Sequence, residues 1–415
     1  MDESAAPTGA GLRLRPFRAM RFNPSVVDDI GEVICPPYDV MDRAMIDDLL
    51  ALSPRNIVRL VLPRLVHEPL AADDPYTTAA KRLARWRREA VFATDAVPAL
   101  YVYEYGDATH RVCGLIGALD LPSPGDQTVL PHEDVIPAIV ADRLAMVVAA
   151  PANLEPILLV YDGAPAASVV VESVRDEEPL IDVIAGDGSA HRMWSITASD
   201  ALAEIQAALL PHQALIADGH HRYAMYRTLQ RRHLEIDERS GPWNRGLVLL
   251  VDQSQYPLRL DAIHRSIADV DLAGLALPAG FEGGAVEAVA GEPRPPSRSG
   301  ELLLTDGVAQ RTIVLPQASG DPVPDVEMLH DRLLPAWGVS EDRVGYHHTI
   351  AQTLTAARRD GGCAVLLHPT TVREVMTVAR SQRVMPRKST SFGPKPRTGL
   401  VMRMFDDEYD AADSS

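Results

Sequence analysis

Apolar positions along this chain recur at two different spacings, so helices and strands should mix throughout. Residues 41–52 carry apolar side chains at close to helical spacing and stop before a Ser-Pro pair, which disfavours helix. Residues 74–92 form a second amphipathic pattern, and residues 199–210 a third that begins at a capping Ser or Asp. Residues 98–105 and 111–121 alternate and are rich in β-formers, which predicts a hairpin.

The remaining apolar runs extend this mixture to the end of the chain. Further strands are expected at 56–63, 155–163, 167–174, 214–217, 245–252, 258–267, 301–305, 311–316 and 363–369. Further helices are expected within 131–150, after Gly219, at 326–337 and at 370–381. The pattern therefore predicts an α/β fold of the mixed, α+β type.

Domain boundaries are indicated where apolar periodicity is lost. Glycine, proline and serine accumulate in 281–300, which predicts a linker between an N-terminal region, 1–280, and a C-terminal α/β region, 301–405. The last residues, 406–415, are acidic and polar, and we expect a disordered tail.

Composition excludes several classes of protein. With 46% hydrophobic and 23% charged residues, the chain is typical of a globular protein, and no stretch approaches the about 20 apolar residues that span a bilayer. We expect a cytoplasmic protein with no membrane contact. A net charge of -17 makes DNA an unlikely partner, because phosphate contacts need a basic face. The three cysteines are scattered without CxxC spacing, which predicts buried thiols rather than disulfides or zinc ligands.

The five residues Asp218-Gly219-His220-His221-Arg222 follow an apolar strand and open a helix. A helix N-terminus offers free N–H groups and partial positive charge to an anion, and glycine lets the backbone approach a ligand. Asp218 can hold Mg²⁺, the two histidines can donate to phosphate, and Arg222 can clamp it with paired hydrogen bonds. The alternative is a capped helix with a solvated histidine pair.

A basic loop near the end of the chain is the second candidate for anion binding. No acidic residue occurs between 375 and 405, and two of the three lysines of the chain, Lys388 and Lys395, lie there. Arg387, Ser389 and Thr390 add a further cation and hydroxyl donors. We expect this loop to fold back on the 218–222 turn and form one phosphate site with it. The alternative is a basic surface loop.

A carboxylate is needed as general base if the chemistry is transfer to a hydroxyl. Glu133, between His132 and Asp134 in a proline-bearing loop, is the candidate, and Asp39 is the second choice. The alternative for this segment is a helix start, where acidic residues favour the macrodipole.

Several blocks of the chain together resemble the domain of unknown function 1015 family, which is described as ParB-like. The blocks are RPFRAMRFNP, VICPPYDV, SPRNIVRLVLP, PHEDVI, ADRLAM, NLEPILLVYDG, IADGHHRYAMYRTL and MPRKSTSFGPKPRTGLV. The DGHHR block is similar to the second box of the ParB/sulfiredoxin superfamily and is nearest to its free-serine kinases. The resemblance implies a ParB/sulfiredoxin-like nucleotide-binding core, with Mg²⁺–nucleotide contact at Asp218, His220, His221 and Arg222. Gly219 stands where sulfiredoxins carry their cysteine, so sulfinic acid repair is not implied.

These observations favour a phosphotransferase that uses ATP or ADP with Mg²⁺ and acts on a small, serine-like hydroxyl compound. In this hypothesis Glu133, Asp218 and His221 are catalytic, and the turn and the basic loop bind phosphates. Two alternatives stay open: a ParB-type nucleotide switch protein, and a phosphoester hydrolase without a small-molecule acceptor. A basic recognition helix would favour the switch protein, and none is evident after Arg222.

Overall fold

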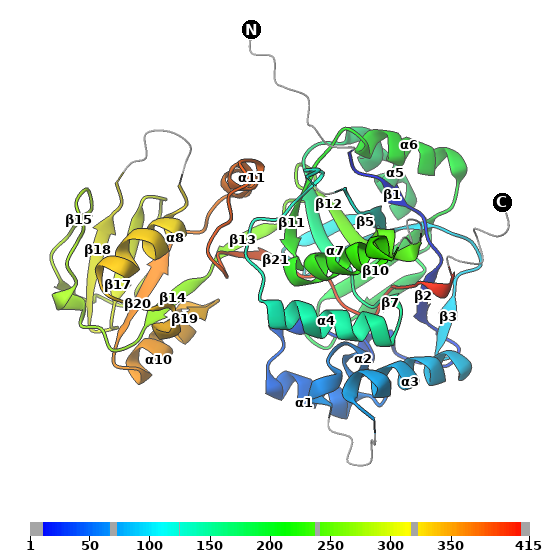
Figure 1. Ribbon diagram of the computed structural model, residues 1–415, viewed down its shortest axis with the longest axis horizontal. Coiled ribbons are helices and arrows are strands. Elements are labelled where there is room, and N and C mark those ends of the chain that lie inside the picture. The colour runs from blue at the N-terminus through cyan, green and yellow to red at the C-terminus, as the bar shows by residue number, and fades with distance from the viewer. Residues whose placement is uncertain (1–10, 67–72, 124, 237–240, 317–322, 408–415) are drawn as a thin grey trace, which may run out of the picture. The chain divides into compact units, whose positions relative to one another are not determined.

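The computed structural model describes residues 11–66, 73–123, 125–236, 241–316 and 323–407 (Figure 1). Its internal contacts divide the chain into two compact units. Unit 1 comprises Met1–Leu130, Val135–Leu258 and Pro394–Ser415, and unit 2 comprises Pro131–Asp134 and Arg259–Gly393. The chain therefore passes between the units four times, and a short piece near residue 133 belongs to the second.

A large, mostly antiparallel sheet forms the centre of unit 1. Its strands lie in the order β6 (Val129–Leu130), β11 (Ala214–Asp218), β8 (Ile157–Tyr161), β12 (Arg245–Asp252), β5 (Arg111–Asp120), β4 (Leu100–Gly106), β10 (Ala190–Ile196) and β9 (Ile181–Ile184), with β1 (Leu14–Arg15) beside β5. Only two of these pairs are parallel in the described residues, β11 with β6 and β12 with β8. Apolar side chains fill both faces of the central strands, so helices must cover the sheet.

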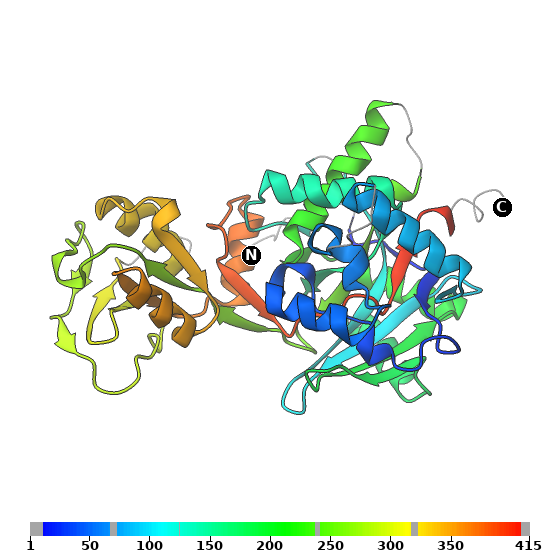
Figure 2. The ribbon, with the colours of Figure 1, turned by 90° about the horizontal axis from the view of Figure 1, so that it is seen from below.

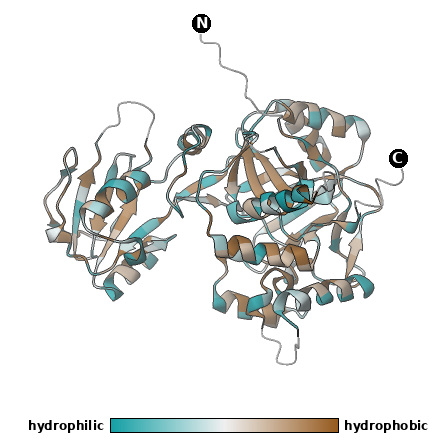
Figure 3. Ribbon diagram, in the orientation of Figure 1, coloured by the Kyte–Doolittle hydropathy of each residue, from teal (hydrophilic) through white to brown (hydrophobic). Residues whose placement is uncertain are grey.

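Helices pack on this sheet and on a smaller one. The large sheet carries α4 (Pro137–Ala149), α5 (Pro165–Arg175), α6 (Ser199–Leu209) and α7 (His220–Glu235). In Figure 1, α7 lies across the sheet beside α4, and Figure 3 shows that α4 is the more apolar of the two. The small sheet joins β3 (Phe92–Thr94), β2 (Ala19–Phe22), β22 (Met402–Met404) and β7 (Ala152–Asn153). Around it lie α1 (Arg43–Leu52), α2 (Val58–Val61) and α3 (Pro75–Arg88), grouped on one side of the unit in Figure 2.

Unit 2 is built on an antiparallel sheet with its own apolar core. The strand order is β15 (Glu282–Gly283), β18 (Ala309–Val314), β17 (Glu301–Thr305), β20 (Cys363–Leu367), β14 (His264–Ile267) and β19 (Val344–His347), with β16 (Glu287–Ala288) also on β18. Its helices are α8 (Asp325–Met328), which continues through a π-turn into α9 (Leu334–Ala336), then α10 (Ile350–Arg359) and α11 (Val372–Arg380). A separate ribbon pairs β13 (Arg259–Ala262) with β21 (Thr390–Gly393). The mixed α/β class predicted from the sequence is confirmed.

Two predicted strands are helices in the structure. The run at 167–174 lies in α5, where Ala167, Val170, Val171 and Val174 are buried at helical spacing while Val169 is exposed. The β-branched composition favoured a strand, but the buried side chains recur every three or four residues, which is the spacing of a helix. The run at 56–63 contains α2 because the buried Asn56 accepts a hydrogen bond from the N–H of Val58 and donates to two carbonyl groups upstream.

The division into units differs from the boundaries expected from composition. Unit 2 begins at Arg259, and the expected linker at 281–300 contains β15 and β16 at the edge of its sheet. The proline and glycine residues there mark turns at the edge of the unit 2 sheet and not a boundary between domains. The C-terminal strand β22 returns to unit 1 through its pairing with β2, and most of the expected tail lies outside the described residues. All three cysteines are buried and free, as predicted.

Candidate functional site

The turn at 218–222 has the strand-to-helix geometry that the sequence predicted. β11 ends at Asp218, Gly219 adopts a left-handed φ of 99°, and α7 begins at His220. A Cβ atom at Gly219 would lie 2.8 Å from Cγ2 of Ile157 and 3.0 Å from Nε of Arg222, so the position excludes larger residues. Gly219, the N-cap residue of α7, has no side chain to cap the helix, and the partial positive charge of the helix dipole lies at this turn.

Asp218 is buried at the centre of a cluster of charges in unit 1. One carboxylate oxygen accepts a hydrogen bond of 2.5 Å from Nη2 of Arg222, and the other accepts one from Nζ of Lys395. The same ammonium group lies 3.4 Å from Oδ2 of Asp39. Burial alone would raise the pKa of Asp218, but Lys395 and Arg222 outweigh it and the pKa is lowered. Conversely, Asp218 and Asp39 overcome the effect of burial and raise the pKa of Lys395.

Arg222 is enclosed by its own chain rather than open to solvent. Its side chain is 3% exposed, and Nη1 donates to the carbonyl of Pro156 at 2.7 Å and lies 3.4 Å from Oε2 of Glu155. Burial opposes its charge, yet Glu155 and Asp218 raise the pKa of Arg222. This differs from the solvent-facing phosphate clamp that we expected, because two buried carboxylates compete for the guanidinium. In the structure Arg222 orients Asp218.

A cavity of about 370 Å³ lies beside this cluster in unit 1. Its polar lining residues are Arg143, Asn153, Glu155 and Arg222. Its apolar lining residues are Val61, Met146, Val147, Ala152, Leu154, Met225 and Tyr226. Both guanidinium groups already pair with carboxylates, Arg143 with Asp142 and Arg222 with Asp218 and Glu155, so this lining does not by itself select an anion.

The two histidines of the turn have different surroundings. Nε2 of His221 accepts a hydrogen bond of 3.0 Å from the N–H of Ile136, just before α4, and so helps to join that helix to α7. His220 is half-buried and its charge acts on Asp218. The catalytic role expected of His221 stays a prediction, and in this structure its Nε2 lone pair is already used.

Lys395 reaches Asp218 because the chain after Gly393 is fixed to unit 1. The carbonyl of Pro394 accepts a hydrogen bond from Tyr105, and the N–H of Arg397 donates to the hydroxyl of Tyr103. Thr398 then donates to Oε2 of Glu155. The part of our prediction that places Lys395 at the turn is therefore confirmed.

Glu133 holds the basic loop of unit 2. Its Oε1 atom accepts three hydrogen bonds, from the N–H of Ser389 at 3.0 Å, the N–H of Thr390 at 3.0 Å and the hydroxyl of Thr390 at 2.9 Å. Nε2 of the buried His132 also contacts that hydroxyl, at 2.9 Å. Sequence reasoning gave Glu133 a role in proton transfer, and the structure shows that it also anchors a turn.

Arg265 holds the same loop through the loop's carbonyl groups. Its fully buried guanidinium donates to the carbonyl of Lys388 at 2.9 Å and, through Nε, to Nε2 of His330 at 3.1 Å. His330 in turn contacts Oε1 of Glu341 at 2.8 Å. Burial lowers the pKa of Arg265 to about 10. Only its position inside a predicted strand could have marked this arginine as buried, and that signal is weak.

With its backbone held on both sides, the loop presents Arg387 and Lys388 as exposed side chains. Lys388 has a left-handed φ of 56°, which the surrounding hydrogen bonds maintain. The sequence-predicted residues are thus divided between the units. Unit 1 holds Asp218, Gly219, His220, His221, Arg222 and Lys395, and unit 2 holds Glu133, Arg387, Lys388, Ser389 and Thr390. That the two groups form a single phosphate site stays a prediction.

The described residues lack two further features, a cluster of metal ligands and a membrane-spanning helix. No group of three or more His, Cys, Asp or Glu side chains there is arranged to hold a metal ion. No helix there has both the length and the apolar character required to cross a bilayer.

Fold and site together define a two-unit α/β protein with a buried ion-pair cluster at a strand-to-helix turn. A family model described as "Protein of unknown function (DUF1015)" matches residues 14–308, and the chain belongs to this family. No curated protein matches the sequence at a significant level.

Several solved structures are similar to parts of the model. A free serine kinase mutant in complex with ADP is 13% identical, with 66% of this chain and 89% of that chain covered and a TM-score of 0.36. The protein SbnI from Staphylococcus aureus, with a C-terminal truncation, is 11% identical, with 71% and 90% covered and a TM-score of 0.38. A conserved hypothetical protein from Pyrococcus furiosus is 15% identical, with 66% and 92% covered and a TM-score of 0.32.

Proposed function

We propose that this protein is a nucleotide-dependent phosphotransferase that moves a phosphoryl group from ATP or ADP to a small hydroxyl-bearing metabolite. The observation that carries the proposal is the ion pair of Lys395 with Asp218 at the turn where β11 ends and α7 begins. Backbone N–H groups, a helix dipole and an ammonium group at one place are the usual means of holding transferable phosphates.

The charges in unit 1 support a nucleotide at this place. Lys395 lies between Asp218 and Asp39 and is half-buried, so an incoming phosphate can take over its ammonium group. Asp39 and Oδ1 of Asp218 then lose the ammonium group, while Arg222 stays paired with Oδ2 of Asp218. Asp218 and Asp39 suit Mg²⁺, which binds one or two protein carboxylates together with substrate phosphates and waters and needs no all-protein cage. When bound, it would neutralise phosphate charge.

The roles of the other residues follow from their surroundings. His220 and His221 begin α7 after the left-handed Gly219, and the helix dipole places partial positive charge at this turn. Arg222 holds Asp218 in place. In unit 2, the exposed Arg387 and Lys388 supply a second anion-binding element, whereas the hydroxyls of Ser389 and Thr390 already donate to Pro386 and Glu133. Glu133 is the proposed base that accepts the proton of the acceptor hydroxyl.

Product analysis tests the proposal directly. Purified protein is incubated with Mg²⁺, ATP or ADP, and a panel of hydroxy compounds, and phosphorus NMR identifies phosphorylated products. We expect a new phosphoester that depends on the acceptor. Release of inorganic phosphate regardless of acceptor would instead indicate a hydrolase, and saturable nucleotide binding with no turnover would indicate a switch protein.

Asp218→Asn tests the site itself. We expect it to lower affinity for the Mg²⁺–nucleotide at least tenfold, measured by calorimetry. Asp120→Asn is the matched control, because Asp120 also ends a strand of unit 1 and pairs with two arginines, Arg15 and Arg245, but at a more open position. Equal nucleotide affinity in the Asp218 variant and the control would contradict the proposed site.

Glu133→Gln tests the base. The amide oxygen keeps accepting from the N–H groups of Ser389 and Thr390, so the loop should keep its conformation. We expect nucleotide affinity to stay nearly unchanged while turnover is lost. Full activity would transfer the role to Asp39 or Asp218.

A further inference from the structure

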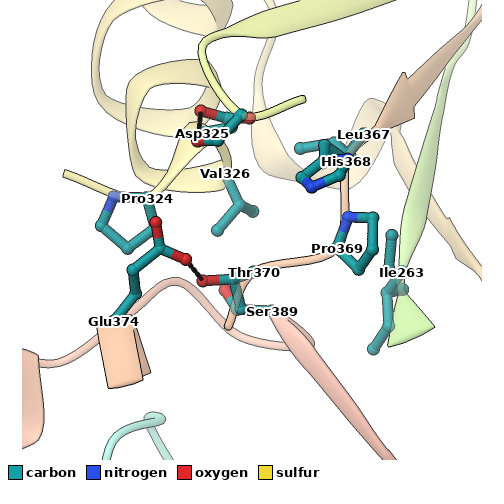
Figure 4. A pocket seen from close by; sticks show the side chains of 12 residues that line it. Ile263, Pro324, Asp325, Val326, Leu367, His368, Pro369, Thr370, Glu374 and Ser389 are labelled. Atoms are coloured by element: carbon teal, nitrogen blue, oxygen red, sulfur yellow. Dashed lines mark hydrogen bonds between the residues drawn. The ribbon is translucent and has the colours of Figure 1, made fainter. Parts of the chain in front are cut away.

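A cavity in unit 2 is not used by the proposed phosphotransfer. It has a volume of about 370 Å³, including its mouth, and lies where the ends of β13 and β20 meet the first turns of α8 and α11. Figure 4 shows Asp325 of α8, Glu374 of α11 and His368, which follows β20, around this space. All of its lining residues belong to unit 2.

The polar groups that face this cavity are hydrogen-bond acceptors with unused capacity. Oδ1 of Asp325 accepts from the hydroxyl of Ser299 at 3.0 Å and the N–H of Gly300 at 2.9 Å, while Oδ2 has no donor among the described residues. Oε2 of Glu374 accepts from the N–H of Thr371 in the capping box of α11, and it also accepts from the hydroxyl of Thr370, the contact drawn in Figure 4. Its Oε1 likewise has no donor in the described part of the chain.

Charge at the cavity is uncompensated. Asp325 is only 7% exposed, and no arginine or lysine among the described residues forms an ion pair with it or with Glu374. The pKa of Asp325 is raised, first by burial and also by the negative charge of Glu374, while the hydrogen bonds from Gly300 and Ser299 and the charge of His368 act to lower it. Other buried carboxylates of this protein, such as Asp218 and Glu327, have a basic partner. A buried carboxylate without one is costly unless a ligand completes it.

His368 is a further polar side chain at the cavity, and its Nδ1 atom donates to the carbonyl of Pro296 at 3.1 Å. The two carboxylates favour a ligand that donates hydrogen bonds and carries positive charge. The described residues hold no group of three ligands arranged for a metal ion, which favours an organic cation.

We propose that this cavity binds the primary ammonium group of a small organic amine through Asp325 and Glu374. An ammonium group has three donors and no acceptor, which matches the carboxylate oxygens of the lining. The apolar side chains of Val326 and Leu367 line the same cavity and would face the carbon atoms of a compact amine. This site is separate from the turn at 218–222, and the proposal does not depend on nucleotide binding there.

Calorimetry and ligand-observed NMR on the full chain test this site with methylamine, ethanolamine and putrescine as probes, and with ethylene glycol as the uncharged counterpart. We expect saturable binding of at least one amine and none of ethylene glycol. Asp325→Asn and Glu374→Gln should each weaken amine binding at least tenfold. Both keep the present hydrogen bonds, because Asn can still accept from Ser299 and Gln still supports a capping box.

Glu301→Gln is the matched control, since Glu301 is a carboxylate of the same unit that is paired with Arg298. It should bind amines as the unmodified protein does. Absence of saturable amine binding at millimolar concentration overturns the proposal, as does equal weakening by the control. Binding of Mg²⁺, Ca²⁺ or Zn²⁺ that Asp325→Asn abolishes, without amine binding, overturns it in favour of a metal site. Nucleotide affinity is measured in the same samples, so loss of the proposed function is recognised separately.

Discussion

Replacing Arg222 tests how much its guanidinium contributes to the stability of unit 1. Arg222→Met keeps much of the apolar volume but removes the charge that lies between Asp218 and Glu155, both of them buried. Removing one partner of a buried ion pair costs roughly 3–5 kcal/mol, because the other charge is left uncompensated. The lost hydrogen bond to the carbonyl of Pro156 acts in the same direction.

Thermal and urea denaturation measure this effect. For a unit of this size, about 2 °C of melting temperature corresponds to each kcal/mol, so we expect a decrease of roughly 6–10 °C. Arg43→Met is the control, since Arg43 forms an exposed pair with Asp47 on α1, and such pairs contribute about 0.3–0.5 kcal/mol.

A second variant separates charge from packing. If orphaned carboxylates cause the loss, Asp218→Asn and Glu155→Gln added to Arg222→Met should recover much of the stability, because a buried ionic group can often be replaced by neutral ones. A melting temperature of Arg222→Met equal to that of Arg43→Met would refute the reasoning. An equally unstable triple variant would show that shape rather than charge is responsible.

Three further predictions follow from single groups. Asp325→Asn should raise the melting temperature of ligand-free protein at pH 7, because burial and then Glu374 raise the pKa of Asp325 and its charged form destabilises the fold. The gain should vanish in acid, where Asp325 is protonated and no longer carries that cost. Glu133→Ala should increase hydrogen exchange at the amides of Ser389 and Thr390, whereas Glu133→Gln should not. NMR titration should show His191 neutral down to about pH 4, because burial and then Arg397 lower its pKa to about 4. The unfolded chain binds this proton at about pH 6.5, so the contribution of neutral His191 to stability is lost as pH falls from about 6.5 to 4.

Local patterns predicted the elements around the turn at 218–222 well. An apolar run followed by Asp-Gly and a helical pattern leaves few alternatives, and the structure has β11, a left-handed Gly219 and α7 there. Patterns failed at 167–174, where β-branched residues occupy the buried side of α5. In that segment the residue composition favoured a strand and the spacing of the apolar residues favoured a helix. The spacing was the better guide, because it reflects which side chains pack against the sheet.

Contacts between distant segments could not be predicted from local sequence. Lys395 was placed at the turn by an argument about charge, and the structure agrees. Nothing near Arg265 indicates that its guanidinium reaches the carbonyl of Lys388, 123 residues away. The cavity at Asp325 was missed for the same reason, since its acidic residues come from two helices and each is ordinary in its own segment.

The two carboxylate oxygens of Glu133 have different hydrogen-bond partners and can serve different roles. Oε1 accepts from two backbone N–H groups and a hydroxyl, so its lone pairs are occupied in holding Ser389 and Thr390. Proton acceptance would therefore fall to Oε2, while Oε1 keeps the carboxylate in one orientation. A residue that both anchors a basic loop and carries a free oxygen links the position of that oxygen to the conformation of the loop. The anchoring role and the proposed chemistry of Glu133 are therefore compatible, because they use different atoms of one carboxylate.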